Sequence, residues 1–175
     1  SLQSKLAQQR HFPAIDWLTS YSFYKQYLKD TFEDSSQGDD MEKLTTKAMG
    51  LLERESNLIE IVRLVGAEAL SPADRLSLET SKSIREDYLH QNAFHKVDTF
   101  TTLEKQYEIL KTVLYFHQKA LEAIDNGVDT ADLFKLKVRE EIARAKFIPE
   151  DQLDKIKQIR ETIDKQIKDL QTTSV

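Results

Sequence analysis

Apolar side chains recur every three or four residues along most of this chain, and this period limits the fold more than any other feature. It places apolar residues on one face of an α-helix. Only 4 glycines and 3 prolines interrupt the 175 residues, and 39% hydrophobic content is enough for one core. We therefore predict an all-α fold, a single bundle of about five or six helices. The most regular stripe is Leu153, Ile156, Ile159, Ile163, Ile167 and Leu170.

Residues that begin or end helices divide this pattern into segments. A glycine often follows the last turn of a helix, and a serine before a proline is a strong start signal. Gly66 and Gly127 are the expected helix ends. Ser71 with Pro72, followed by Asp74 in the first turn, marks one helix start, and Pro149 marks the start of the last helix. The predicted helices cover residues 17–33, 41–65, 72–90, 99–127, 131–147 and 149–170.

Three details of this prediction can be checked separately. The polar stretch 34–40 is expected to break the helical pattern, with Asp39 or Asp40 capping the next helix. Residues 91–99 lack a clear period and are expected to form a structured loop. In the helix over 41–65, Ile61 and Val65 belong to the stripe expected to be buried.

Composition excludes several classes of function. A formal net charge of -5 argues against binding to nucleic acid, which needs clustered Lys and Arg. The chain has no cysteine, no apolar run of the roughly 20 residues that cross a bilayer, and no glycine-rich phosphate loop. We therefore expect a cytoplasmic chain that neither inserts into a membrane nor carries catalytic residues of its own.

Two further functions remain open at this level. The stripe from Leu153 to Leu170 could be a seam for a partner helix, as in a stand-alone scaffold or coiled-coil module, although the edge of a bundle is the commoner explanation. A di-iron centre needs paired Glu-x-x-His motifs, and only Glu86, Asp87 and His90 approach one. For His11, His95 and His117, packing or hydrogen bonding is expected.

Two aromatic segments are unusual for linkers. Residues 11–17 place Phe12 and Trp17 around a proline, and residues 91–95 place Phe94 among polar amides. Such a phenylalanine could stack on a planar ring, whereas most buried aromatic residues are structural. From the residues alone, core packing is the more common outcome for each.

Three stretches resemble the catalytic A subunit of archaeal-type and vacuolar-type rotary ATPases. Residues 5–22, KLAQQRHFPAIDWLTSYS, are similar to the exit from its nucleotide-binding domain, and residues 84–98, IREDYLHQNAFHKVD, to its adenine-side loop. Residues 64–76, LVGAEALSPADRL, resemble the helix-loop-helix that carries the acidic DELSEED torque loop in related β subunits. The resemblance implies a linker over 1–16 and a C-terminal helical bundle domain over 17–175, with the phosphate loop upstream of Ser1.

The resemblance also implies which residues act. Adenine would lie against Phe12, Gln91, Asn92, Ala93 and Phe94, while ATP or ADP with Mg²⁺ would be held mainly by the upstream domain. The expected partners are the B subunits and the central stalk of a soluble ATPase head peripheral to the membrane, coupling ATP synthesis or hydrolysis to ion transport. The expected stalk-contact residues are Glu68, Ala69, Leu70, Ser71, Pro72 and Asp74.

One departure from the related torque loop affects the expected mechanism. Where that loop is crowded with acids, this chain has Ala67, Ala69, Pro72 and Ala73. Repulsion between charges is therefore a poor explanation for a push on the stalk. A capped helix start with a rigid proline suits a steric push.

Overall fold

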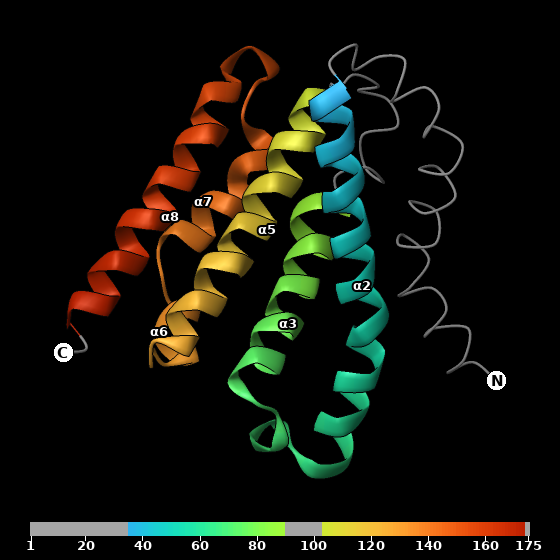
Figure 1. Ribbon diagram of the computed structural model, residues 1–175, viewed down its shortest axis with the longest axis vertical. Helices are drawn as coiled ribbons and strands as arrows, with labels where there is room; N and C mark the ends of the chain where they lie inside the picture. The colour runs from blue at the N-terminus through green and yellow to red at the C-terminus, as the bar shows by residue number, and fades with distance from the viewer. Residues whose placement is uncertain (1–34, 90–102, 174–175) are drawn as a thin grey trace.

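The computed structural model describes residues 35–89 and 103–173, and all of its regular elements are helices (Figure 1). The predicted helix over 17–33, the predicted loop over 91–99 and the start of the next helix lie outside the described residues. The helical class is confirmed. The α-helices are α2 (Ser35–Val65), α3 (Pro72–Ser83), α5 (Leu103–Asp125), α6 (Thr130–Phe134), α7 (Val138–Arg144) and α8 (Leu153–Thr173). Short turns are the 3₁₀ elements η1 (Ala67–Ala69), η3 (Ala145–Phe147) and η4 (Glu150–Gln152), and the π-helix η2 (Ile84–Leu89).

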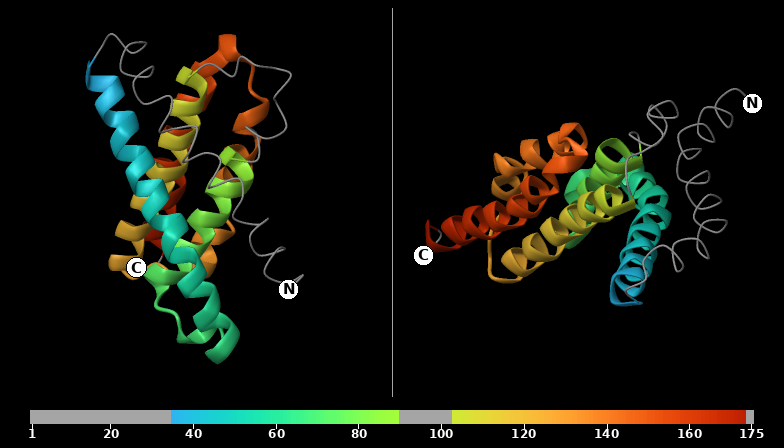
Figure 2. Two further views of the ribbon diagram at one scale, coloured as in Figure 1. Left: turned by 90° about the vertical axis from the view of Figure 1, so that its right-hand side faces the viewer. Right: turned by 90° about the horizontal axis from the view of Figure 1, so that it is seen from above.

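α5 lies in the middle of the bundle and runs in the same direction as α2 and α8, while α3 and the short α7 run the opposite way (Figures 1 and 2). α2 and α3 form an antiparallel pair, and α8 packs along the other side of α5. The chain reverses after α2 at Gly66 and after α5 at Gly127, whose φ angles are 94° and 91°. Residues with a Cβ rarely adopt these angles, which explains why glycine ends both helices as predicted.

The core lies where α5 meets its neighbours. Ile109, Leu110 and Val113 of α5 are buried, and so are Ile156, Ile159, Ile163 and Ile167 of α8. Leu153 and Leu170 are partly buried against the same core. The C-terminal stripe therefore packs inside this chain, and the alternative of an open seam for a partner helix is wrong.

α2 begins earlier than predicted, at Ser35, and the expected break over 34–40 is wrong from that residue onward. A glycine inside a helix costs about 1 kcal/mol relative to alanine. Contacts with α5 offset this cost, because the Tyr107 hydroxyl donates to Asp40 Oδ2 at 2.5 Å and Met41 is buried. Asp40 therefore binds a neighbouring helix, and the prediction that Asp39 or Asp40 caps a helix start is wrong, because both lie inside α2.

The single helix predicted over 131–147 is also wrong, because the chain forms α6, α7 and η3 there. Gln166 Oε1 on α8 accepts the Val138 N–H at 3.0 Å, which satisfies a donor at the start of α7. Arg139 donates to the Phe134 carbonyl at the end of α6 at 3.2 Å. These two side chains stabilise the interruption. The last helix differs less from the predicted range 149–170, because α8 begins at Leu153, just after Pro149 and the short turn η4.

His117 links α5 to α3 inside the bundle, as expected of a packed and hydrogen-bonded histidine. Its Nδ1 shares a hydrogen bond of 2.6 Å with Thr80 Oγ1. Burial, aided by the positive charge of Lys47, lowers the pKa of His117 to about 4 from an ordinary value of 6.5. The folded chain therefore keeps this ring neutral at pH values where an unfolded chain protonates it.

The lowered pKa of His117 predicts that the stability of the folded chain depends on pH. Between pH 6.5 and 4 the unfolded state binds more protons, so the stabilisation present above pH 6.5 is lost as the pH falls toward 4. In urea titrations, His117→Gln should lose less stability than the original chain over this interval. Asp87, whose pKa burial raises, has the opposite effect in both proteins and cancels from the comparison. Parallel pH profiles would contradict the assignment.

Candidate functional site

The residues expected to contact adenine lie outside the described residues. Phe12, and Gln91 to Phe94, fall in the ranges 1–34 and 90–102, so their roles stay predictions. The described residues on either side of 90–102 are Leu89, at the end of η2, and Leu103, at the start of α5. Both lie toward the end of the bundle opposite the α2–α3 turn (Figure 1).

The expected stalk-contact residues form the turn between α2 and α3. α2 continues below the start of α3, and the chain returns through η1 (Figure 1). Ser71 then caps α3, its hydroxyl accepting the Asp74 N–H at 3.2 Å, and Pro72 occupies the first turn as predicted. Leu70 is buried, so it anchors the turn to the bundle.

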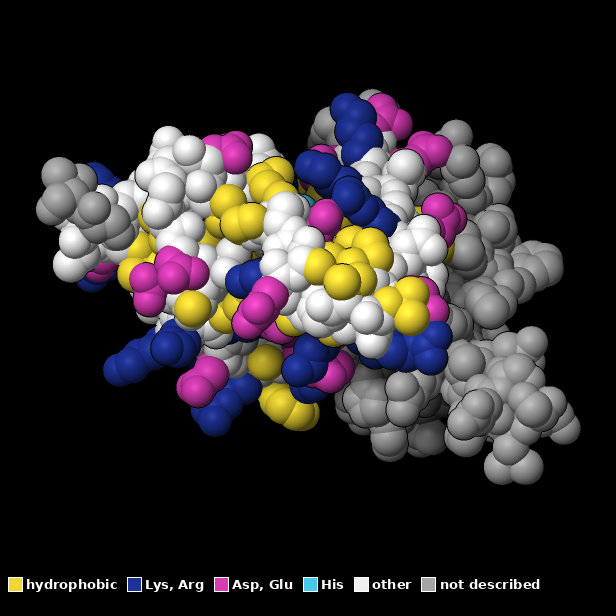
Figure 3. All heavy atoms as spheres, turned by 90° about the horizontal axis from the view of Figure 1, so that it is seen from below, with side chains coloured by type: hydrophobic (Ala, Val, Ile, Leu, Met, Phe, Trp, Pro, Cys, Tyr) yellow, Lys and Arg dark blue, Asp and Glu magenta, His cyan; other side chains and the backbone are white. Residues whose placement is uncertain are grey.

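The outer face of this turn is apolar. Leu64 and Val65 are 70% and 71% exposed, and Ile61 is 39% exposed. The prediction that Ile61 and Val65 are buried is therefore wrong, because the end of α2 projects past the helix that would cover them. We call the exposed apolar residues of this turn the apolar tip, defined as Ile61, Leu64, Val65, Ala67, Ala69 and Pro72. Hydrophobic side chains gather on the face of the molecule seen from this end (Figure 3).

Charges around the apolar tip are largely paired within the chain. Arg54 binds Asp74 at 2.8 Å, and Arg63 binds Glu60 at 2.6 Å. The hydrogen bond from Arg63 lowers the pKa of Glu60. Glu68 is exposed and has no ion-pair partner among the described residues. Glu68 is thus the one acid of the turn left unpaired within 35–89 and 103–173, while apolar surface dominates the tip.

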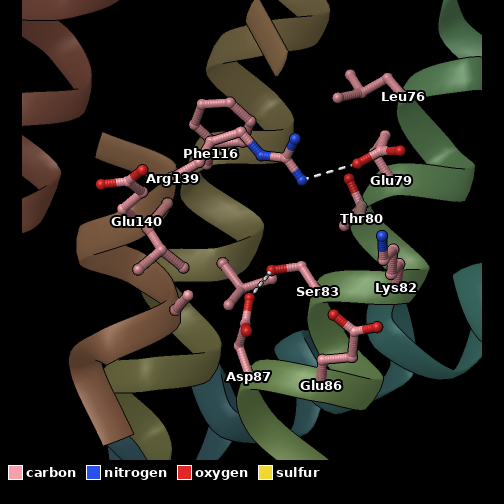
Figure 4. A pocket seen from close by; sticks show the side chains of 13 residues that line it. Leu76, Glu79, Thr80, Lys82, Ser83, Glu86, Asp87, Phe116, Arg139 and Glu140 are labelled. Atoms are coloured by element: carbon pink, nitrogen blue, oxygen red, sulfur yellow. Dashed lines mark hydrogen bonds and ion pairs between the residues drawn. The ribbon is translucent and has the colours of Figure 1, made fainter. Parts of the chain in front are cut away.

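A cleft of about 250 Å³ separates α3 from α7 above the tip (Figure 4). Its floor is apolar, with Leu76 and Phe116, and the ion pair between Arg139 and Glu79 spans it at 2.8 Å. Ser83 donates to Asp87 at 2.6 Å at the other end. The ion pair between Arg139 and Glu79 thus ties α3 to α7.

The described residues also bear on metal and membrane binding. Within 35–89 and 103–173, no three His, Asp or Glu residues lie close enough together to hold a metal ion. Glu86 and Asp87 line the cleft, and His90 falls outside the described residues. No described helix has both the length and the apolarity to cross a bilayer.

Comparison with known proteins tests the resemblance directly. A family model described as the C-terminal domain of V and A type ATP synthase matches residues 22–134. The V-type ATP synthase alpha chain of Acetivibrio thermocellus is 51% identical over 170 residues, which cover 97% of this chain and 29% of that protein. The A subunit of the A-type ATP synthase of Methanopyrus kandleri is 50% identical over 171 residues, with the same two coverages.

A third relative is similar over a shorter range. The V-type ATP synthase alpha chain of Clostridium botulinum strain Langeland is 52% identical over 155 residues, which cover 89% of this chain and 26% of that protein. The chain therefore spans less than a third of the length of these curated relatives. Since the family model covers more than half of its residues, this chain belongs to the family of C-terminal domains of V and A type ATP synthases.

Proposed function

We propose that this chain is the C-terminal domain of the catalytic A subunit of a rotary ATP synthase. In this function it closes the adenine side of the nucleotide pocket and transmits movement to the central stalk, so that ATP synthesis or hydrolysis is coupled to ion transport. ATP or ADP with Mg²⁺ is held mainly by the upstream domain, and B subunits are neighbours in a soluble, cytoplasmic head. The isolated chain is expected not to hydrolyse ATP.

The observation that carries this proposal is one continuous helical rod. α3 and η2 follow each other without a gap over residues 72–89. At about 1.5 Å per residue α3 alone is roughly 18 Å long, and the π-helix η2 extends it. One end meets the apolar tip, and the other leads directly into the residues expected to contact adenine. A displacement at the adenine side would therefore reach the tip through a single element.

The rod is tied to the rest of the bundle on several sides. Arg139 of α7 binds Glu79, and His117 of α5 binds Thr80. The Ser81 hydroxyl donates to the Leu51 carbonyl of α2 at 3.0 Å. Packed helices with such links move together as a rigid body. This supports a movement of the whole domain rather than bending at the tip.

The chemistry of the tip favours steric contact with the stalk. Leu64 and Val65 are exposed apolar side chains on the most projecting turn, and exposed apolar patches of this kind mark interaction sites. Asp74 is already paired with Arg54, which weakens any role for it as a free charge. We therefore expect apolar surface and stiffness, more than acidity, to deliver the push.

Two double substitutions at the same turn test this mechanism in the assembled complex. Leu64→Asp with Val65→Asp should reduce ATP-driven rotation, because it places charge where the stalk meets apolar surface. Glu68→Gln with Asp74→Asn should leave rotation largely intact, since losing an exposed ion pair costs only about 0–1 kcal/mol. Single-molecule rotation and nucleotide affinity would be measured for both. A stall in the second protein alone would show that charge drives the contact.

A further inference from the structure

The cleft between α3 and α7 has two ends that differ in how their charges are matched. At one end Arg139 of α7 donates to Glu79 of α3 at 2.8 Å, so a cation and an acid meet across the cleft (Figure 4). At the other end Asp87, from η2, accepts a hydrogen bond from Ser83 at 2.6 Å and forms no ion pair among the described residues. The chain thus supplies an arginine at one end of the cleft and leaves the other end without one.

Acidic side chains outnumber basic ones along the cleft. The charged residues that line it are the acids Glu79, Glu86, Asp87 and Glu140 and the bases Lys82 and Arg139. Since Arg139 is paired with Glu79, three carboxylates remain with one ammonium group, that of the exposed Lys82. Three negative charges and one positive charge leave a net charge of -2, which attracts a cation.

The carboxylate of Asp87 has room for a cationic partner. A carboxylate can accept roughly four hydrogen bonds, and within the described part of the chain Ser83 donates the one that Asp87 accepts. Burial raises the pKa of Asp87, and the hydrogen bond from Ser83 offsets only part of this effect. The positive charges of Lys146 and Arg139 act in the same direction as that hydrogen bond. A further cation placed beside Asp87 would stabilise its ionised form.

The size and the floor of the cleft define the kind of cation that fits. Sites for small organic ligands usually enclose about 300–1,000 Å³, whereas this cleft has about 250 Å³, which suits a single long side chain. The floor is apolar, with Leu76, Val113 and Phe116 buried in the bundle. A bare inorganic ion would leave this apolar floor in contact with water. The occupant therefore needs a cationic head on an apolar stem.

We propose that the cleft between α3 and α7 receives the side chain of an arginine from a neighbouring subunit, with its stem on Phe116 and its guanidinium on Asp87. Arginine suits this position better than lysine, because its guanidinium is weakly hydrated and can donate two hydrogen bonds to one carboxylate. Its methylene groups pack on apolar surface while the head stays at the rim. The chain already uses arginine in this way at the other end, where Arg139 binds Glu79. That the partner is a subunit of the ATP synthase rests on the proposed function, whereas the chemistry of the cleft does not.

Binding of a free arginine probe tests the chemistry of the cleft. Nα-acetyl-arginine amide and its uncharged analogue Nα-acetyl-citrulline amide are titrated into the isotope-labelled 175-residue chain at low ionic strength, and amide chemical shifts are followed by NMR. We expect the arginine probe to shift signals of α3, η2 and α7 around the cleft, and the citrulline probe to bind at least about five-fold more weakly. Equal binding of the two probes, or shifts only in other parts of the chain, would overturn the assignment.

Acids at different positions provide matched variants for this titration. Asp87→Asn removes the charge expected to contact the guanidinium, keeps the size of the side chain, and should weaken binding of the arginine probe about five-fold. Glu141→Gln removes the same charge from an exposed residue of α7 that does not line the cleft, and should leave binding unchanged. Equal effects of the two substitutions would mean that the probe is attracted only by the overall acidity of the chain.

A second variant keeps the test decisive if Asp87→Asn does not fold, as judged by circular dichroism. Glu140 lines the cleft from α7 and is exposed, so Glu140→Gln is expected to fold. It should weaken binding of the arginine probe about two-fold, because an exposed charge contributes less. No difference between Glu140→Gln and Glu141→Gln would then count against the cleft.

The source of the arginine is tested in the assembled complex. Lys82 lines the cleft and is exposed, so Lys82→p-benzoylphenylalanine places a photoreactive group at its rim. After irradiation, mass spectrometry should find a cross-link to an arginine-containing segment of another subunit, and replacing that arginine by glutamine should reduce the cross-link.

Cross-links confined to this chain, or cross-linking that is unchanged by the replacement, would overturn a neighbouring subunit as the source. The rotation assay of Leu64→Asp with Val65→Asp tests the proposed function separately. If rotation is unchanged there while the arginine probe still binds in the cleft, the proposed function fails and the chemistry of the cleft stands. If rotation falls and the probe shows no preference over citrulline, only the inference about the cleft fails.

Discussion

Replacing Ile163 by alanine should destabilise the domain by about 2–5 kcal/mol, the cost of removing a fully buried aliphatic side chain and leaving a cavity. Ile163 is at the centre of the α8 stripe and is 0% exposed. On one side of it lies α5, whose buried residues are close-packed and cannot collapse fully into the space. Chemical denaturation of the 175-residue chain, followed by circular dichroism, measures the change.

Ile59 provides a matched control for this prediction. It is also an isoleucine within a long helix, but it is 48% exposed. Ile59→Ala should change the free energy of unfolding by only about 0.5 kcal/mol, as most surface substitutions do. Equal losses at the two positions would mean that α8 does not pack on α5 as described. The contrast therefore tests the central contact of the bundle.

Local signals predicted much of this fold because they act over short distances. Gly66 and Gly127 end helices through their own backbone conformations, and Ser71 caps α3 through an atom three residues away. Each effect depends on residues that are neighbours in the sequence. The C-terminal stripe was likewise predictable, since its spacing alone defines one apolar face.

The wrong predictions for the start of α2 and for a single helix over 131–147 have a different cause, which is a side chain from a distant element. Gln166 stabilises the start of α7, and Tyr107 holds the beginning of α2 through Asp40. Neither contact is visible in the local sequence of the helix it changes. Tertiary contacts of this kind outweigh propensities of about 1 kcal/mol or less per residue.

The candidate site could likewise be predicted only as far as local sequence determines it. The position of the tip turn was predictable from Gly66 and Ser71, whereas its apolar character was missed at Ile61 and Val65. Periodicity shows which side chains share a face, but it does not show how far the neighbouring helix extends.

The adenine role of Phe94 gives the other large expected effect. In the full-length protein, Phe94→Ala should weaken ADP binding by about 1–3 kcal/mol, or roughly 5-fold to 150-fold, because a base loses an aromatic stacking surface. Phe94 lies outside the described residues, so this expectation depends on the segment resemblance and on its closeness in sequence to Leu89, where the rod ends. Calorimetric titration with ADP measures the loss.

The effect should be confined to binding, because the base is far from the phosphate that reacts. An interaction that is equally strong in the ground state and the transition state changes the affinity and leaves kcat nearly unchanged. Phe94→Tyr keeps the aromatic face and should bind ADP almost normally, whereas Phe12→Ala should resemble Phe94→Ala if both rings contact one base. Normal ADP affinity with lost turnover in Phe94→Ala would instead place this residue in the transmission of movement, since the base would then not depend on its ring.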